Sequence, residues 1–327
     1  MSTPLLDINN LKVYFPMYKG GFFKRKTEDL KAVDGVDLNI GHGEVIGLVG
    51  ESGCGKSTVA KAIMCLTKMI SGSIKLEGDE LNRLTSKELK IKRPEFQMIF
   101  QDPFSSLNPR MTVFSILAEP LLYHKLVKKS ELTDTLSTLL QEVGLSPRDM
   151  GKYPHEFSGG QLQRIAIAKA LSLKPKLIIA DEPVSSLDVS IRSQILNLLL
   201  RLIKEHSLTL LFISHDLSVI RHISDRIAVM YLGKIVETGA NKQVYSHPAQ
   251  PYTHALLSAV PVPDPDKEKI RKRIILKGEP PSPINPPSGC SFHPRCPYVR
   301  NKCTTITPEL EPVEEGHMVA CHFPLSS

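Results

Sequence analysis

The chain lacks the long apolar runs of a membrane-spanning protein. Nowhere in its 327 residues do about 18 consecutive apolar residues occur, the length that a membrane-crossing helix needs. The N-terminal segment, MSTPLLDINN, lacks the basic block and the following apolar block of a secretory signal peptide. Internal repeats and low-complexity tracts are missing as well. The missing apolar run excludes a protein that crosses a membrane by itself. Because a signal-peptide pattern is missing too, we expect this protein to stay in the cytoplasm.

Length and composition indicate a globular protein with more than one part. Apolar residues make up 41% and charged residues 23% of the chain, which is ordinary for a globular protein. A chain of 327 residues exceeds one ordinary core, so we expect one large domain and an extension. The net charge of +7 would suit a polyanion or an anionic membrane surface, but a dispersed surplus on a solvated face explains most of it. Basic residues concentrate locally at 19–26 and 267–277.

Hydrophobic patterns predict strands that alternate with helices. Strands are expected at residues 5–15, where Pro16 would end the strand, and at 32–40, 44–49, 177–180, 208–213, 226–231 and 234–237. Helices are expected at 56–64, 113–123, 132–143 and 191–206. This alternation favours a largely parallel α/β sheet, with the helical middle of the chain as an inserted subdomain. Eight prolines between 261 and 287 indicate an extended linker into a small tail.

A glycine-rich loop predicts phosphate binding. Residues 50–58, GESGCGKST, fit the pattern GxxxxGK[ST], and they follow a predicted strand and open a predicted helix. The glycines let backbone amides curl round phosphates, and the helix N-terminus adds a favourable dipole. We expect Lys56 to reach the β- and γ-phosphates of a nucleotide and Ser57 to ligate magnesium. The other candidates for nucleotide contact are Gly50, Ser52, Gly53, Cys54, Gly55 and Thr58, with Cys54 as a filler and not a reactive thiol.

An apolar strand that ends in two acids predicts the catalytic centre. In residues 177–183, LIIADEP, Asp181 at the strand tip can hold the magnesium shell, and Glu182 can polarise an attacking water as general base. A strand this apolar should lie inside a sheet, which argues against a surface pair of acids. Upstream, FSGGQ at 157–161 provides a helix cap at Ser158 and exposed backbone donors at Gly159 and Gly160.

Together these motifs resemble the ATP-binding subunit of ABC transporters. SGGQ matches that family's signature motif, preceded by phenylalanine in place of the usual leucine. The resemblance implies that Gln101, in MIFQDP, is a glutamine that touches magnesium, and that His215, in ISHD, contacts the γ-phosphate. It further implies that Asp188 belongs to the family's D-loop. Phe15 would stack on adenine, with Tyr14 as the next candidate and strand packing as the alternative for both.

The same resemblance implies a fold and a divided active site. The fold is a P-loop NTPase of the RecA-like kind. An ABC nucleotide-binding domain spans residues 1–260, with an antiparallel β subdomain and an inserted α-helical subdomain at about 103–157. Residues 261–327 form the proline-rich linker and a small cysteine-containing C-terminal extension. Two such domains meet head to tail. The residues that then act in trans on the partner's ATP are Ser158, Gly159, Gly160, Gln161 and Asp188.

Further signatures resemble one branch of that family, the oligopeptide and dipeptide permeases. They are PFSSLNP at 103–109, YPHEF at 153–157, HPAQPYTHA at 247–255 and the proline-rich tail. The implied function is an ATPase, using ATP and Mg²⁺, that powers peptide uptake at the cytoplasmic side of the membrane. The implied partners are a second, homologous ABC ATPase, two transmembrane permease subunits and a separate substrate-binding protein, with no nucleic acid.

Three alternatives accompany this interpretation. Nickel and glutathione importers share the same signatures, so the cargo could differ while the ATPase role stays the same. An ABC ATPase that acts on nucleic acid or ribosomes is disfavoured, because the chain has one cassette and no heptad tract. A degenerate, non-hydrolysing cassette is disfavoured because Glu182 and His215 are both present.

Four cysteines gather near the end of the chain. Cys290, Cys296, Cys303 and Cys321 are spaced C-x5-C-x6-C-x17-C. In a cytosolic chain such a cluster favours a metal or redox centre over disulfides, because four thiolates can bind zinc or an iron–sulfur cluster. The likeness to peptide-permease tails puts a [4Fe-4S] cluster first, Zn²⁺ second, and four free cysteines that pack the tail third.

Overall fold

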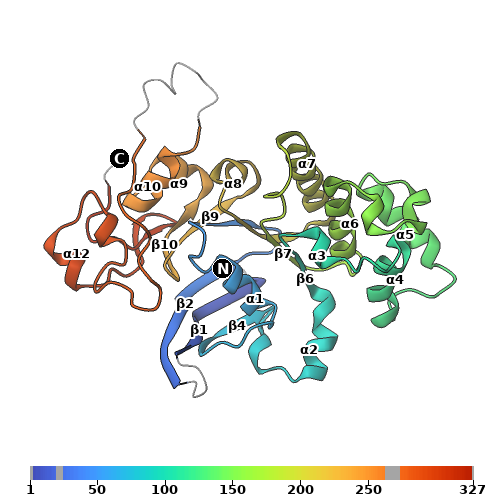
Figure 1. The fold of residues 1–327 in the computed structure, drawn as a ribbon, viewed down its shortest axis with the longest axis horizontal. Coiled ribbons are helices and arrows are strands. Elements are labelled where there is room, and N and C mark those ends of the chain that lie inside the picture. Colours follow the sequence, from blue (N-terminus) through green and yellow to red (C-terminus); the bar gives the residue numbers. More distant parts are fainter. Residues whose placement is uncertain (1–2, 20–24, 262–272, 326–327) are drawn as a thin grey trace. The chain divides into compact units, whose positions relative to one another are not determined.

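Two units make up the chain, whose computed structural model describes residues 3–19, 25–261 and 273–325. The first unit comprises Met1–Ile40, Glu44–Asn82 and Ser214–Ser327, and the second comprises Gly41–Gly43 and Arg83–Ile213. The basic segments at 19–26 and 267–277 and the proline-rich linker that was predicted from residue 261 fall partly outside the described residues. Figure 1 shows the elements of both units along the chain.

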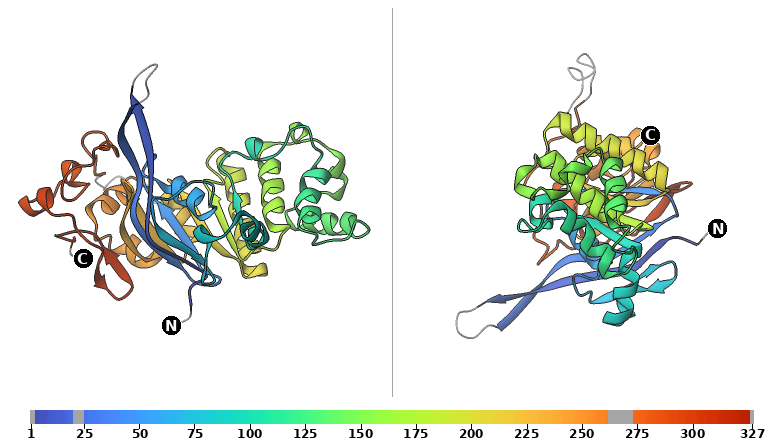
Figure 2. Two further views of the ribbon diagram at one scale, coloured as in Figure 1. Left: turned by 90° about the horizontal axis from the view of Figure 1, so that it is seen from below. Right: turned by 90° about the vertical axis from the view of Figure 1, so that its right-hand side faces the viewer.

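An antiparallel sheet opens the first unit, with the strand order β2-β1-β4-β5. The strands are β1 (Leu6–Lys19), β2 (Arg25–Ile40), β4 (Ser71–Leu76) and β5 (Asp79–Glu80). β1 and β2 form one long twisted ribbon (Figure 2). The prediction that Pro16 ends β1 is wrong. β4 pairs with β1 only as far as Lys12, so at Pro16 β1 has one described neighbour, and no second ladder needs the missing amide.

A second sheet of this unit carries the strand before the glycine-rich loop. Its order is β11-β12-β10-β9-β3, in which β3 and β9 are parallel and the other pairs are antiparallel. The strands are β3 (Val45–Val49), β9 (Arg226–Tyr231), β10 (Lys234–Ala240), β11 (Glu311–Glu314) and β12 (His317–Val319). The helices are α1 (Lys56–Ile63), α8 (Leu217–Ile223), α9 (Asn241–Ser246), α10 (Pro251–Ser258) and α12 (Asn301–Thr305). The C-terminal residues thus add β12 beside β10, which the sequence pattern did not predict.

Three buried aromatic rings anchor the C-terminal residues. Tyr231 comes from β9, Tyr252 from α10 and Phe292 from the segment before α12, and none is more than 1% exposed. The ring centres lie 4.7 Å apart for Tyr231 and Tyr252, 5.3 Å for Tyr231 and Phe292, and 5.4 Å for Tyr252 and Phe292. Such tilted and edge-on pairs add to the free energy that the buried area provides. The side chain of Phe292 therefore packs the extension onto the sheet.

Parallel strands and a group of helices form the second unit. β8 (Thr209–Ser214), β7 (Leu177–Asp181) and β6 (Phe96–Ile99) pair in that order, and β7 and β8 are buried along their whole length. The helices are α2 (Ser86–Lys92), α3 (Pro103–Ser106), α4 (Val113–Tyr123), α5 (Leu132–Glu142), α6 (Gly159–Leu171) and α7 (Val189–His206). α4, α5 and α6 pack on one another. The predicted α/β class, with antiparallel and parallel sheets, is confirmed. No helix within the described ranges is long and apolar enough to cross a membrane.

Replacing Phe292 by alanine should destabilise the extension, because it opens a cavity between Tyr231 and Tyr252. Removing a buried phenylalanine ring costs about 3–5 kcal/mol. The free energy of unfolding, measured by denaturant titration, should fall by that amount. Tyr298→Ala, at a 45% exposed position of the same extension, should lower it by about 1 kcal/mol or less. Equal effects of the two substitutions would contradict an anchoring role of Phe292.

Candidate functional site

The glycine-rich loop joins β3 to α1 and passes so close to neighbouring backbone that two positions admit no side chain. Gly50 and Gly55 have φ angles of +153° and +112°. A Cβ at Gly50 would lie 2.2 Å from the carbonyl oxygen of Met230, and a Cβ at Gly55 would lie 2.1 Å from that of Ala32. Both positions therefore need glycine, and the loop is held against β9 and β2.

Lys56 lies inside this loop. Its side chain is 5% exposed, and Nζ donates hydrogen bonds to the carbonyl oxygens of Gly50, at 2.8 Å, and Glu51, at 3.0 Å. Because α1 begins at Lys56, this ammonium lies at the positive end of the helix dipole, an arrangement suited to a phosphate anion. Cys54 is buried, and burial raises the pKa of its thiol. A neutral, packed thiol agrees with its interpretation as a filler.

Two further predicted residues of the first unit are exposed. Phe15 on β1 is 40% exposed, so its ring is accessible to a planar ligand. Tyr14 is engaged instead, because its hydroxyl donates to Oδ1 of Asp34 at 2.5 Å. Burial and the Asp34 carboxylate raise the pKa of Tyr14 to about 12.

His215 is exposed and directly follows β8, just before Asp216 caps the N-terminus of α8.

In the second unit, the structure brings Gln101 and Glu182 together. Gln101 follows β6, Glu182 follows β7, and Nε2 of Gln101 donates to Oε2 of Glu182 at 3.0 Å. Asp181, the last residue of β7, is 5% exposed. Glu182 has a φ of +47°, a left-handed conformation that costs a non-glycine residue about 1–3 kcal/mol. A hydrogen bond from its amide to the carbonyl of Ile213, at 3.0 Å, helps to hold that conformation.

The SGGQ segment forms the start of α6. The hydroxyl of Ser158 accepts from the amide of Gln161 at 3.4 Å, and Oε1 of Gln161 accepts from the amide of Ser158 at 3.0 Å. Ser158 and Gln161 are both exposed. Gly160 is buried, and a Cβ there would lie 2.4 Å from Cγ2 of Ile191, so close packing of α6 against α7 by itself requires this glycine. In the predicted trans-acting segment, Ser158 and Gln161 are thus exposed, whereas Gly160 packs against α7.

Asp188 caps the N-terminus of α7. Its Oδ1 accepts hydrogen bonds from the amide of Ile191 at 3.0 Å and from the hydroxyl of Ser190 at 2.8 Å. These bonds, the one from the Ile191 amide first, lower the pKa of the Asp188 carboxyl. Asp188 therefore carries its charge at the exposed start of a helix, which that charge stabilises.

The predicted metal centre of the cysteine-rich extension is wrong. Cys290, Cys296, Cys303 and Cys321 do line one cavity, but its volume is only about 10 Å³. Among the described residues, no three His, Cys, Asp or Glu side chains are arranged to hold a metal ion. Burial raises the pKa of the thiols of Cys290, Cys296 and Cys321. Both the [4Fe-4S] cluster and the zinc alternative are therefore withdrawn in favour of free cysteines that pack the extension.

Sequence reasoning missed three residues that contact one another in and around the glycine-rich loop: Glu51, Tyr252 and Arg295. The carboxylate of Glu51 accepts two hydrogen bonds from Arg295, and the amide of Glu51 donates to the hydroxyl of Tyr252 at 2.8 Å. Tyr252 lies in the HPAQPY segment and Glu51 in the glycine-rich motif, but neither residue was assigned a role from the sequence. Nothing in the sequence pairs Arg295 with a residue 244 positions earlier.

Comparisons with known proteins cover both ends of the chain. A family model described as ABC transporter matches residues 33–185, and one described as oligopeptide/dipeptide transporter, C-terminal region, matches residues 236–303. The chain is 52% identical to the oligopeptide transport ATP-binding protein AppF of Bacillus subtilis, over 98% of this chain and 97% of AppF. It is 53% identical to the oligopeptide transport ATP-binding protein OppF of Escherichia coli, over 97% of this chain and 95% of OppF. Among solved structures, the ATP-binding cassette MJ0796 bound to ADP and Pi is 30% identical with a TM-score of 0.63, and the match covers 72% of this chain and 98% of that one.

Gly55→Ala should abolish nucleotide binding, because the new methyl group cannot fit beside the Ala32 carbonyl and must displace the loop. Gly78→Ala is the matched control: Gly78 also has a positive φ, +88°, but apart from its chain neighbours no described heavy atom lies within 4 Å of the position that its new methyl group would take. Affinity for a fluorescent ATP analogue, measured by titration, should be lost in the first variant and kept in the second. Wild-type affinity in Gly55→Ala would contradict the close-packing argument.

Proposed function

The chain belongs to the ABC transporter family, among its oligopeptide transport ATP-binding proteins, and we propose that the ATP hydrolysis it performs drives uptake of di- and oligopeptides. The observation that carries the proposal is the likeness to such proteins over nearly the whole chain, including the C-terminal region. The hydrolysis reaction converts ATP and water to ADP and phosphate. The peptide cargo is inferred from the names of the relatives.

The proposed mechanism assigns roles to residues of both units. Lys56 exchanges its carbonyl partners for β- and γ-phosphate oxygens, which neutralises charge that develops there. Glu182 accepts the proton of the attacking water, and its strained backbone and its bond to Gln101 support a positioned carboxylate. His215 contacts the γ-phosphate, and Phe15 stacks on adenine with its exposed ring.

Magnesium fits the donors that the chain offers. The hydroxyl of Ser57, the side-chain carbonyl of Gln101 and the carboxylate of Asp181 are oxygen ligands, the type that magnesium prefers. The bond from Gln101 to Glu182 uses the amide nitrogen of Gln101 and not its carbonyl oxygen. When bound, the ion neutralises charge on the β- and γ-phosphate oxygens.

A second ATPase subunit completes each site in this proposal. Ser158 and Gln161 are exposed at the N-terminus of α6, where backbone donors can meet a phosphate of the partner's ATP. Asp188 acts at the same junction. Two permease subunits and a separate substrate-binding protein make up the rest of the complex, with this chain at the cytoplasmic face of the membrane.

Glu182→Gln should bind ATP but lower kcat by about 10²–10⁴-fold, because the amide cannot accept the proton of water. Phosphate release measures turnover, and size-exclusion chromatography with ATP measures the closed dimer that should accumulate. Glu205→Gln, at an exposed position of α7, is the control and should hydrolyse ATP like the unmodified chain. Undiminished turnover of Glu182→Gln would refute the general-base assignment.

Affinity purification from membranes of the native cell should recover two polytopic membrane proteins with this chain. In the purified complex, addition of peptide-loaded binding protein should raise the ATPase rate. Recovery with ribosomes or DNA and without membrane proteins would sink the transport proposal. Stimulation by a metal chelate or glutathione, and not by peptides, would retain the ATPase role and replace the cargo.

A further inference from the structure

Glu51, the second residue of the glycine-rich loop, is held through three of its groups. Its amide donates to the hydroxyl of Tyr252 at 2.8 Å, and its carbonyl accepts from Nζ of Lys56 at 3.0 Å. Its carboxylate accepts from both terminal nitrogens of Arg295, at 2.7 and 3.0 Å. Two of these three contacts come from the C-terminal third of the chain. The loop is thus fixed from outside as well as by its own glycines.

The pair between Arg295 and Glu51 has the geometry of a strong interaction. Two parallel hydrogen bonds join the guanidinium to the carboxylate, and such forked, charge-assisted pairs are directional. The Arg295 side chain is 7% exposed and that of Glu51 is 27% exposed, so solvent screens the pair less than a surface ion pair. The bonds to Glu51 raise the pKa of the Arg295 guanidinium, while its partial burial acts in the opposite direction.

Arg295 is itself positioned by the aromatic anchor of the extension. Its amide donates to the carbonyl of Phe292 at 3.0 Å, and Phe292 packs between Tyr231 and Tyr252. The guanidinium therefore projects from a short turn, His293–Arg295, whose start is fixed in the core. A rigid support of this kind lowers the entropy cost of keeping a long side chain in one place.

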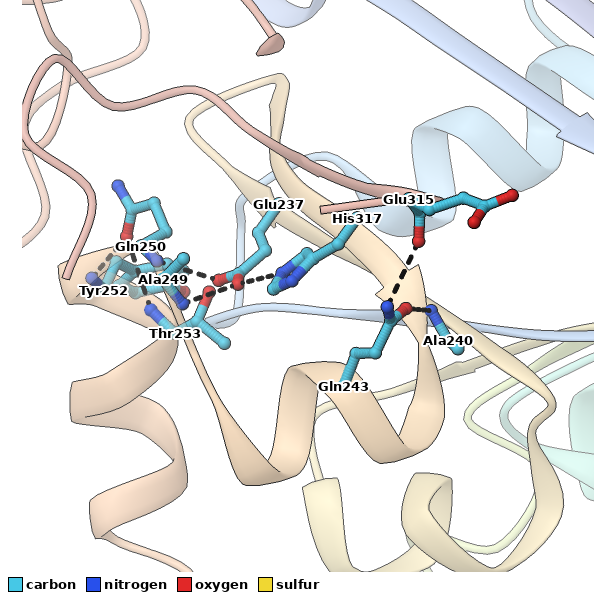
Figure 3. A network of polar contacts seen from close by, with 9 residues as sticks. All are labelled: Glu237, Ala240, Gln243, Ala249, Gln250, Tyr252, Thr253, Glu315 and His317. Atoms are coloured by element: carbon cyan, nitrogen blue, oxygen red, sulfur yellow. Dashed lines mark hydrogen bonds and ion pairs between the residues drawn. The ribbon is translucent and has the colours of Figure 1, made fainter. Parts of the chain in front are cut away.

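Tyr252 has a separate, fully buried support, shown in Figure 3. Glu237 accepts hydrogen bonds from the amides of Ala249, at 2.8 Å, and Gln250, at 3.2 Å, and its Oε1 lies 2.7 Å from Nε2 of His317. The side chain of Gln250 then accepts from the amide of Tyr252 and caps α10. Glu237, Gln250 and His317 are each at most 1% exposed. The HPAQPY segment, which ATP chemistry does not use, thus aims the Tyr252 hydroxyl at the loop.

We propose that the C-terminal extension sets the phosphate affinity of the loop, with Arg295 as a positioning residue that acts through Glu51. Arg295 does this in two ways. It holds the residue whose carbonyl contacts Lys56, and it neutralises a carboxylate that would otherwise repel the phosphates of ATP. The inference rests on the proposed role of residues 50–58 in binding ATP. Arg295 has no contact with the nucleotide in this scheme.

Steady-state kinetics of the full-length ATPase test the proposal. Arg295→Met keeps the aliphatic packing but leaves Glu51 unpaired and charged, so KM for ATP should rise about 10-fold, or about 1.4 kcal/mol, with kcat changed less than about 2-fold. Affinity for ADP should fall less than affinity for ATP, because ADP carries less charge. Arg295→Lys, which keeps the charge, should recover part of the loss. Lys302→Ala, which removes an exposed charge from the same extension, should leave KM unchanged.

The double variant Arg295→Met with Glu51→Gln separates the proposed action from a general weakening of the extension. Removal of both charges should bring KM to within about 3-fold of the unmodified chain, since the coupling lies between these two residues. An unchanged KM in Arg295→Met, or a double variant as impaired as the single one, overturns the proposal. Lys56→Ala reports on the loop itself. If Lys56→Ala loses ATP binding while Arg295→Met binds ATP normally, only this inference is wrong. If Lys56→Ala binds ATP normally, the assignment of residues 50–58 as the phosphate-binding loop is wrong.

Discussion

The close approach of the glycine-rich loop to two carbonyl groups is the constraint on which the site depends. Gly50 lies against the backbone at Met230, and Gly55 lies against the backbone at Ala32. Both approaches are too close to leave room for a Cβ atom on either glycine. This packing fixes the start of α1 and, with it, the buried ammonium of Lys56. A loop with this little freedom has little entropy to lose when an anion binds. Backbone contacts thus hold the loop in place independently of any charged side chain.

The C-terminal extension adds electrostatic and apolar support to that loop. Its Phe292 closes a buried aromatic cluster, and its Arg295 meets the carboxylate of Glu51. Its four cysteines are free, and of these Cys303 is buried while the other three are partly exposed. Contacts with β9, α10 and the loop make it part of the first unit.

Local sequence patterns predicted the elements whose burial is continuous. The strand, loop and helix around Lys56 were predicted within a residue or two, as were β7, β8 and α7, because apolar runs and glycine spacing report directly on backbone conformation. The sequence did not predict β11 and β12, whose four and three residues are too short to show a period. It also could not pair Arg295 with Glu51, since only the folded chain brings those positions together. The cysteine spacing indicated which residues gather but not whether their thiols could bind metal.

Pro16 gives a last consequence of the fold. Beyond Lys12, β1 pairs with β2 on one side and with no described strand on the other. An open strand edge of this kind can recruit a strand from another molecule and begin aggregation. Proline offers no amide hydrogen to an incoming strand and places its ring in the way. We therefore expect Pro16, the residue that first suggested the end of a strand, to disfavour the pairing of another chain along this part of β1.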